Sequence, residues 1–224
     1  MDGNTTPEVM AKEVSALNTF WLIQYLTDRH PSLDLQGMLD RLAKMFPCYV
    51  ENLQSGVVEP VRLYHLQNPR YWFSHNFVKA FHDLILEQVP DPRLGYKIGS
   101  TLHKTQPVIR TTLGMALLGG HRVAMKISQE AAKYNRTKEY QIRKLEKGFV
   151  EIRIVHNPGI VINEFTMQWN AGCFAAYAKL AGANDITVDA ICVDSGPTHS
   201  DEDKRSIWDF QIRYQEPNLL IRLG

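Results

Sequence analysis

Cys173 and His199 are the two residues whose types could form a nucleophile and its base. A catalytic cysteine attacks as a thiolate, so it needs a base or a positive charge beside it. Cys173 lies among alanines and glycines, a setting that favours a small buried residue. Gly119-Gly120-His121 lacks the lysine and hydroxyl residue of a phosphate-binding loop. We therefore expect Gly119-Gly120-His121 to start a helix. Because neither set of residues forms a catalytic motif, we predict that this chain is not an enzyme.

Two other histidines, His82 and His103, are possible ligands of a haem iron. A single histidine on a predicted helix is more often a core or surface residue, so we expect no haem and no other cofactor. A haem-based gas or redox sensor stays open as an alternative function, and a Soret band would identify it.

Aromatic residues predict a binding cavity where helices cover a sheet. Such a cavity is apolar and carries a few polar groups that orient a ligand. Trp169 and Tyr177 lie eight residues apart, close to one helical face, and Trp72 and His75 are three apart. Core packing is the competing role of each residue alone. The candidate ligand-binding residues are Trp72, His75, Tyr96, Tyr134, Trp169 and Tyr177.

The elements that would position these residues begin with helices. Thr6, Pro7 and Glu8 form a helix-start signal, and an apolar stripe continues to His30-Pro31. A second helix is expected over 35–45 and a third from Pro69 through Ile85. Shorter helices are expected at 94–99, 113–118 and 121–134.

After Arg136 the apolar period changes to two, which predicts a hairpin over 140–154. A helix at 165–181 and a strand at 186–193, expected to be buried on both faces, follow. Trp208, Phe210, Ile212 and Tyr214 alternate along a last strand. The predicted fold class is α+β: a helical N-terminal part packed on a β-β-α-β-β antiparallel sheet unit with helices on one face.

Composition excludes several classes of partner and compartment. The formal net charge of the 224-residue chain is +1, which argues against direct nucleic-acid binding. The basic run 138–147 is interpreted as the solvated face of a strand. Three scattered cysteines predict no disulfide framework. The N-terminus lacks a signal peptide and no apolar run reaches about 20 residues, so we expect a cytoplasmic protein without membrane insertion.

The C-terminal segment carries an ordered set of short motifs. Gly172 and the turn Leu180-Ala181-Gly182 come first, then Asp189-x-x-Cys192 and Trp208-Asp-Phe-Gln-Ile. This set resembles the 4-vinyl reductase domain of bacterial ligand-responsive regulators, sensor kinases and cyclases. Upstream, Tyr71-Trp72-Phe73-Ser74 and the run 91–99 resemble the helical segment that precedes such domains.

The resemblance also implies a zinc site, from which this chain departs. Met167 and Trp208 stand where the resemblance implies two zinc cysteines, and neither side chain is a usual zinc ligand. We therefore expect no metal. The alternative ligand set would be Cys173, Asp189, Cys192 and His199. Residues 189 and 192 point to opposite faces of a regular strand, which disfavours that set.

These observations predict a non-catalytic sensory or regulatory domain. It would bind a small apolar or aromatic molecule and signal to an output domain or partner, with a homodimer expected. A structural dimerisation module without ligand is another alternative. The expected organisation is an N-terminal helical segment over 1–65, the sensory domain over 66–216, and a tail or connector to a C-terminal output domain over 217–224.

Overall fold

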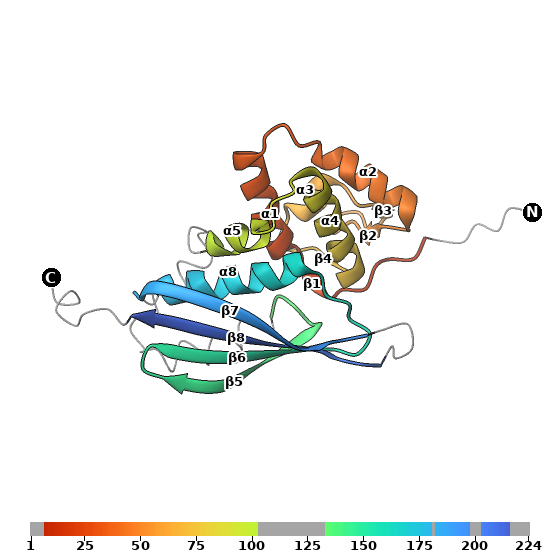
Figure 1. Ribbon diagram of the computed structural model, residues 1–224. Coiled ribbons are helices and arrows are strands. Elements are labelled where there is room, and N and C mark those ends of the chain that lie inside the picture. Colours follow the sequence, from red (N-terminus) through yellow and green to blue (C-terminus); the bar gives the residue numbers. More distant parts are fainter. Residues whose placement is uncertain (1–6, 103–132, 181, 198–202, 216–224) are drawn as a thin grey trace, which may run out of the picture. The chain divides into compact units, whose positions relative to one another are not determined.

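The computed structural model describes residues 7–102, 133–180, 182–197 and 203–215 (Figure 1). The chain divides into two compact units, Met1–Pro90 and Asp91–Gly224. The domain boundary expected after residue 65 lies inside the first of these units. Of the helices in the described ranges, none is long and apolar enough to cross a membrane. The helices expected at 113–118 and 121–134 lie outside the described residues.

The first unit is built from helices around aromatic side chains. Phe73, Phe77 and Phe81 are fully buried, and neighbouring ring centroids lie 5.3 and 6.3 Å apart. Its helices are α1 (Ala16–Arg29), α2 (Leu35–Met45), α3 (Leu63–Leu66) and α4 (His75–Gln88). Its short strands are β1 (Val14–Ser15), β2 (Tyr49–Glu51), β3 (Val58–Pro60) and β4 (Trp72–Phe73), paired β1 with β4 and β2 with β3.

Two of these helices begin later than the sequence predicts. The Ser15 hydroxyl accepts a hydrogen bond from the Leu17 amide at 3.2 Å, so α1 begins at Ala16 and not near Pro7. The Ser74 hydroxyl accepts from the Phe77 amide at 3.2 Å, so α4 begins at His75 and not at Pro69. The two helix starts follow the strands β1 and β4, which pair with Val14 opposite Phe73 and Ser15 opposite Trp72. The predicted bounds of α2 and the predicted end of α1 are confirmed.

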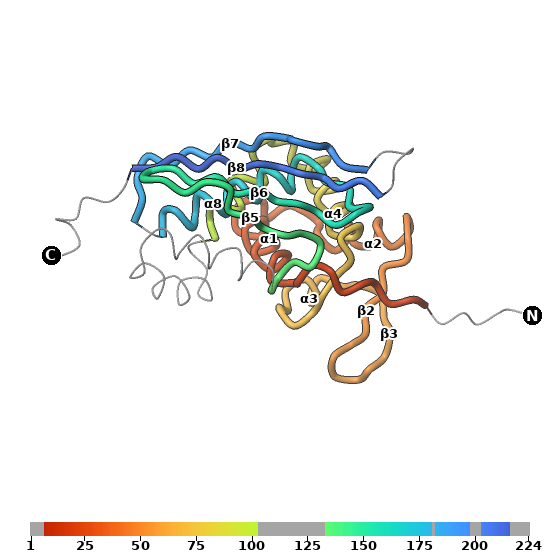
Figure 2. Tube along the Cα trace, turned by 90° about the horizontal axis from the view of Figure 1, so that it is seen from below, coloured from red at the N-terminus to blue at the C-terminus, as the bar shows by residue number. Residues whose placement is uncertain are grey.

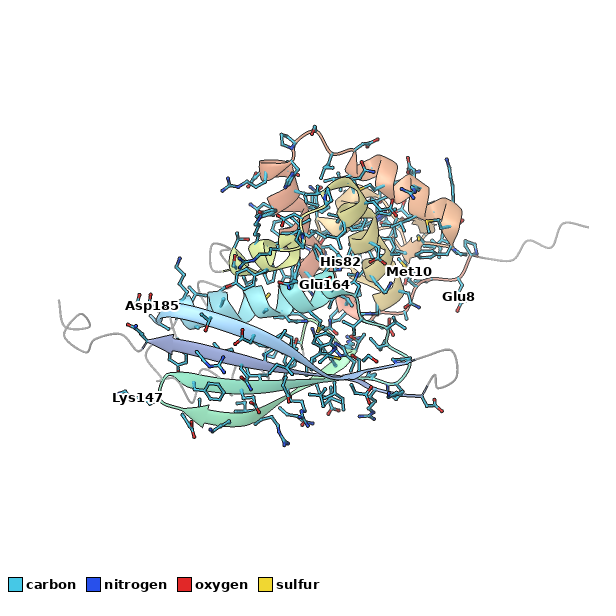
Figure 3. The ribbon with its side chains drawn as sticks, in the orientation of Figure 1. Glu8, Met10, His82, Lys147, Glu164 and Asp185 are labelled. Carbon is cyan, nitrogen blue, oxygen red and sulfur yellow. The ribbon has the colours of Figure 1, made fainter. Side chains whose placement is uncertain are left out.

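The second unit is an antiparallel sheet with a long helix on one face, which confirms the predicted α+β class and the β-β-α-β-β order. Figures 1 and 2 show α8 running along the sheet, whose strand order is β5-β6-β8-β7. The elements of this unit are α5 (Leu94–Ser100), β5 (Lys138–Glu146), β6 (Phe149–His156), α8 (Glu164–Leu180), β7 (Asn184–Ser195) and β8 (Ser206–Gln215). Figure 3 labels Lys147 in the β5–β6 turn and Asp185 near the start of β7.

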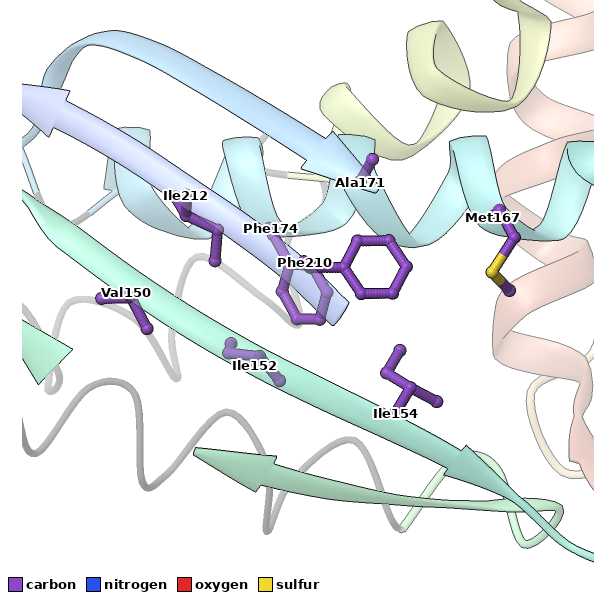
Figure 4. Close-up of a cluster of buried hydrophobic side chains, with 8 residues drawn as sticks. All are labelled: Val150, Ile152, Ile154, Met167, Ala171, Phe174, Phe210 and Ile212. Atoms are coloured by element: carbon purple, nitrogen blue, oxygen red, sulfur yellow. The ribbon is translucent and has the colours of Figure 1, made fainter. Parts of the chain in front are cut away.

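The centre of the sheet face under α8, here called the inner face, is apolar. Ile152 lies opposite Phe210, and the Phe174 ring of α8 meets the Phe210 ring edge-on, with centroids 5.1 Å apart. Burial of such side chains is the main stabilising term of a small sheet unit. The cluster drawn in Figure 4 consists of Val150, Ile152, Ile154, Met167, Ala171, Phe174, Phe210 and Ile212.

Glycines bring α5 and α8 into close contact. A Cβ on Gly172 of α8 would lie 2.3 Å from the carbonyl oxygen of Tyr96, and one on Gly99 of α5 would lie 2.3 Å from the carbonyl oxygen of Trp169. Both contacts are with backbone, which has little freedom to move. The two helices therefore pack at a separation that no larger residue permits.

The strand β7 differs from its prediction. We expected residues 186–193 to be buried on both faces, but the run Asp189–Val193 is exposed at every position. Within the described residues β7 pairs with β8 alone and forms an edge of the sheet. An apolar sequence is compatible with a central strand and with an edge strand, and its composition does not distinguish the two.

Candidate functional site

A buried lysine marks one end of the inner face. Lys138 opens β5 opposite His156 of β6, and it shares the inward phase of the strand with Tyr140 and Ile142. Only 8% of Lys138 is exposed. Lysine is almost never this deeply buried without a partner, because removing its charge from water is costly.

The ammonium group of Lys138 is held by α8. Its Nζ donates to Oδ1 of Asn170 at 2.7 Å, and the Asn170 amide donates in turn to the Thr166 carbonyl at 2.8 Å. The same Nζ lies 5.4 Å from the centre of the Tyr140 ring, within range of a cation–π interaction. Among the described residues, no carboxylate forms an ion pair with Lys138. We define the Lys138 cluster as Lys138, Tyr140, Asn170 and Cys173. Within the described residues, this cluster holds a positive charge and no carboxylate that would neutralise it.

Burial shifts each titratable group of the cluster toward its neutral form. It lowers the pKa of Lys138 to about 8, and it raises the pKa of Tyr140 well above its usual value. It also raises the pKa of the Cys173 thiol to about 12, although nearby Lys138 opposes that shift. At neutral pH the cluster presents an ammonium, a phenol and a thiol, all of them proton donors. This arrangement can bind an anion, and its protonated thiol is a poor nucleophile.

Polar groups of two further strands lie at the same end of the sheet. His156 is 1% exposed, and its Nδ1 lies 3.3 Å from the carbonyl oxygen of Ser206. The Trp208 indole donates to the Ser206 hydroxyl at 3.0 Å. Lys138, His156 and Ser206 therefore form a polar border beside the apolar cluster.

The predicted ligand-binding residues of the second unit lie along α5, α8 and the turn before β5. Tyr96 and Tyr177 pack against the apolar cluster, and the Trp169 ring lies 6.1 Å from the ring of Phe165. Tyr134 is 39% exposed in the turn that precedes β5. Their role in binding stays a prediction.

The other two predicted residues, Trp72 and His75, belong to the first unit. Trp72 lies half-buried in β4, and His75 is buried in the first turn of α4, where its amide donates to Glu13 at 2.8 Å. His82, one of the possible haem ligands, is buried two turns further along α4 and is labelled in Figure 3. Burial, assisted by His75, lowers the pKa of His82 to about 3, so its imidazole is neutral at physiological pH. His103 lies outside the described residues.

The alternative metal ligands are not brought together in the described part of the chain. Asp189 accepts a hydrogen bond from Arg213 at 2.5 Å, Cys192 lies opposite Trp208 on the exposed strand β7, and Cys173 lies in α8. No group of three metal-binding side chains occurs among the described residues. His199 is outside them. Met167 and Trp208, which replace the implied zinc cysteines, both belong to the apolar packing under α8.

Lys138 is not among the site residues that the sequence predicts. The prediction of a solvated strand face for the basic run 138–147 holds for Arg143 and Lys144 but not for Lys138. The signal was present in the alternation, because Lys138 has the same phase as Tyr140 and Ile142. A lysine on the apolar phase of a strand is unusual and could have been singled out.

The chain matches no known protein family and no curated protein by sequence. Solved structures do match. A Cs H-NOX mutant with the unnatural amino acid 4-cyano-L-phenylalanine superposes with a TM-score of 0.53 at 12% identity, over 91% of this chain and 98% of that one. The fold is that of H-NOX domains. An oxygen-binding H-NOX domain related to soluble guanylate cyclases gives a TM-score of 0.53 at 12% identity, over 91% and 95% of the two chains.

This likeness corrects two expectations from the sequence. The resemblance to the 4-vinyl reductase domain was wrong, because the matching structures of this fold are H-NOX domains. The expectation of no cofactor, in which haem was the less favoured alternative, is contradicted as well. A further structure of the fold, with a TM-score of 0.52 at 13% identity over 91% and 95% of the two chains, was solved to probe haem distortion in the H-NOX family.

Proposed function

We propose that the chain is a non-catalytic sensory domain that holds haem and responds to a small gas molecule. The support is the fold, which is shared with an oxygen-binding H-NOX domain, together with the buried positive charge of Lys138. Haem, when bound, supplies an iron that binds diatomic gases reversibly. This proposal takes up the gas-sensor alternative and replaces the apolar or aromatic ligand expected first.

The Lys138 cluster fits the carboxylate side chains of haem. A propionate needs donors and a positive charge, and Lys138 has an ammonium whose described partners are the Asn170 oxygen and the face of the Tyr140 ring. Neither partner carries a formal charge. A bound carboxylate would restore the ion pair that the buried ammonium lacks among the described residues.

The iron requires a neutral imidazole, and the chain offers two candidates from the sequence analysis. His82 is buried with its pKa lowered to about 3, so its imidazole is neutral at physiological pH. His103 follows the last residue of α5, Ser100, by three positions in the sequence. Either side chain has the chemistry of an axial ligand, His103 belongs to the same unit as Lys138, and variants distinguish the two histidines.

The experiment is a haem titration of the full-length protein, followed by the Soret band. We expect the wild type to bind haem and Lys138→Met to bind it at least about tenfold more weakly, because a charged hydrogen bond contributes about 1.5–3 kcal/mol. Lys144→Met is the matched control, since Lys144 lies on the same strand with 54% of its side chain exposed. Of His82→Ala and His103→Ala, one should lose or shift the Soret band.

Two outcomes would contradict the proposal. The first is a wild-type protein that gains no Soret band when haem is added. The second is a band that survives unchanged in both histidine variants, which would indicate nonspecific haem adsorption. A colourless protein whose thermal stability rises with an aromatic carboxylic acid, through Lys138, would instead favour an organic anion as the ligand.

A further inference from the structure

The two edges of the β5-β6-β8-β7 sheet have opposite character. The edge strand β5 carries the basic residues Lys138, Arg143 and Lys144 and contains a register shift between Ile142 and Lys144. Charged side chains and bulges are the usual devices that keep an edge strand from pairing with another chain. The β5 edge is therefore protected against pairing with another chain.

The central part of the β7 edge carries one charged side chain, Asp189, and no register shift. The twelve residues of β7 include no lysine, arginine or proline, and the register shifts of this strand fall near its ends, leaving Thr187–Cys192 regular. Ile191 is 43% exposed and Val193 is 49% exposed. Isoleucine, valine and threonine are favoured in strands at the edge and at the centre of a sheet alike. The regular backbone and the exposed apolar side chains of β7 are compatible with a second pairing partner, and the described residues pair this strand on one side only.

We propose that β7 pairs with β7 of a second copy of this chain, antiparallel and centred on Ile191, to form a continuous eight-stranded sheet across a two-fold axis. A two-fold axis places the same residues on both sides, so the strand must be complementary to itself. Centring on Ile191 places the two Ile191 side chains opposite each other and Cys192 opposite Ala190, within the regular part of β7. Asp189 then lies nearest to Val193, beside the register shift between Cys192 and Asp194, so no aspartate faces another aspartate. Like charges directly opposite would destabilise the pair.

This pairing explains why an apolar strand lies at an exposed edge. The pairing would bury Ile191 and Val193 and would satisfy the backbone groups of the free edge of β7. It does not depend on the proposed haem site, so the two proposals succeed or fail separately.

Sedimentation of the full-length protein tests the oligomeric state. We expect the wild type to sediment at twice the 25.6 kDa chain mass. Ile191→Lys should weaken dimerisation at least about tenfold, since it places two lysines opposite each other. The control is Val57→Lys, which adds the same charge at a 60% exposed valine of the first unit. This control should remain dimeric.

A spin label on Cys192 tests the surface without a substitution in the protein. Cys192 is the exposed member of the three cysteines, while Cys48 is buried and burial raises the pKa of its thiol to about 11. In the proposed register the two Cys192 side chains are diagonal neighbours about 7–8 Å apart, so the labels should lie within about 20 Å. A monomeric wild type, a dimeric Ile191→Lys variant, or labels farther apart than this would each overturn the proposal.

Discussion

The inner face of the sheet has a centre and an end with different chemistry. At the centre, Phe174 and Phe210 meet in an apolar cluster that excludes water. At the end, Lys138 carries a charge that is nearly as deeply buried. The first arrangement stabilises the fold, whereas the second costs stability, since a buried ammonium loses its hydration. A residue that destabilises its surroundings is a candidate for function, which is why the site is assigned to the end of the sheet and not to its centre.

The largest expected effect is at the apolar centre. Phe210→Ala should lower the free energy of unfolding by about 3–5 kcal/mol, because the substitution leaves a cavity beside the Phe174 ring. Urea denaturation measures this effect. The control Ile191→Ala, on an exposed position of the same sheet, should change it by less than about 0.5 kcal/mol in dilute monomer. Equal effects at the two positions would show that the centre is not the core.

A smaller effect is expected where α8 holds the buried charge. Asn170→Ala should destabilise the protein by about 2 kcal/mol, because it leaves the Lys138 ammonium without its amide acceptor. The control is Asn157→Ala, which removes an exposed asparagine that donates to the Arg136 carbonyl at 3.0 Å. If the two variants lose the same stability in urea, Asn170 does not support the charge.

The smallest expected effect is on the pH dependence of stability, which should depend on Lys138 at the end of the inner face and not on the apolar centre. The folded pKa of Lys138 is about 8 and its ordinary value is 10.5, so between these values the unfolded state binds more protons. Lys138 should therefore contribute a rise in the free energy of unfolding with pH, by at most about 1.4 kcal/mol per unit. The buried thiols of Cys173 and Cys48, whose pKa values are raised, contribute a slope of the opposite sign in every variant. Denaturation between about pH 8 and pH 9.5 should therefore give a more positive slope in the wild type and in Lys144→Met than in Lys138→Met. An identical slope in Lys138→Met would mean that the ammonium is not desolvated.

Local patterns were sufficient to predict much of the second unit. The hairpin β5–β6 and the strand β8 follow from alternation, and Trp208, Phe210 and Ile212 do lie on one face. The helix α2 follows from apolar spacing. These predictions succeed because the determining residues are close together in the sequence.

The predictions that were wrong depend on contacts between residues that are far apart in the sequence. The start of α1 depends on pairing of Val14 with Phe73, which are distant in the sequence, and so the nearer signal at Thr6 and Pro7 was misleading. The position of β7 at an edge depends on strand order, which its own residues do not reveal. Short motifs such as Asp189-x-x-Cys192 suggested the wrong relatives, because a few residues determine a fold less strongly than the order and packing of its elements do.

The candidate site could be predicted from the sequence only in part. Its lysine could have been found from the strand period, but its partner Asn170 lies 32 positions away on α8. No pattern within either segment links the two residues. The predicted aromatic residues Trp169 and Tyr177 do lie on α8, the helix that carries Asn170, and their contribution to binding remains a prediction.

The haem content of the purified protein is the direct test of the proposed haem-binding function. The full chain is to be expressed in cells supplied with a haem precursor, and haem is measured per chain as the pyridine complex, with carbon monoxide difference spectra of the reduced protein. We expect close to one haem per chain and a shifted Soret band with carbon monoxide, both strongly reduced in Lys138→Met. A purified protein that is folded but contains no haem would rule out the proposed haem-binding function.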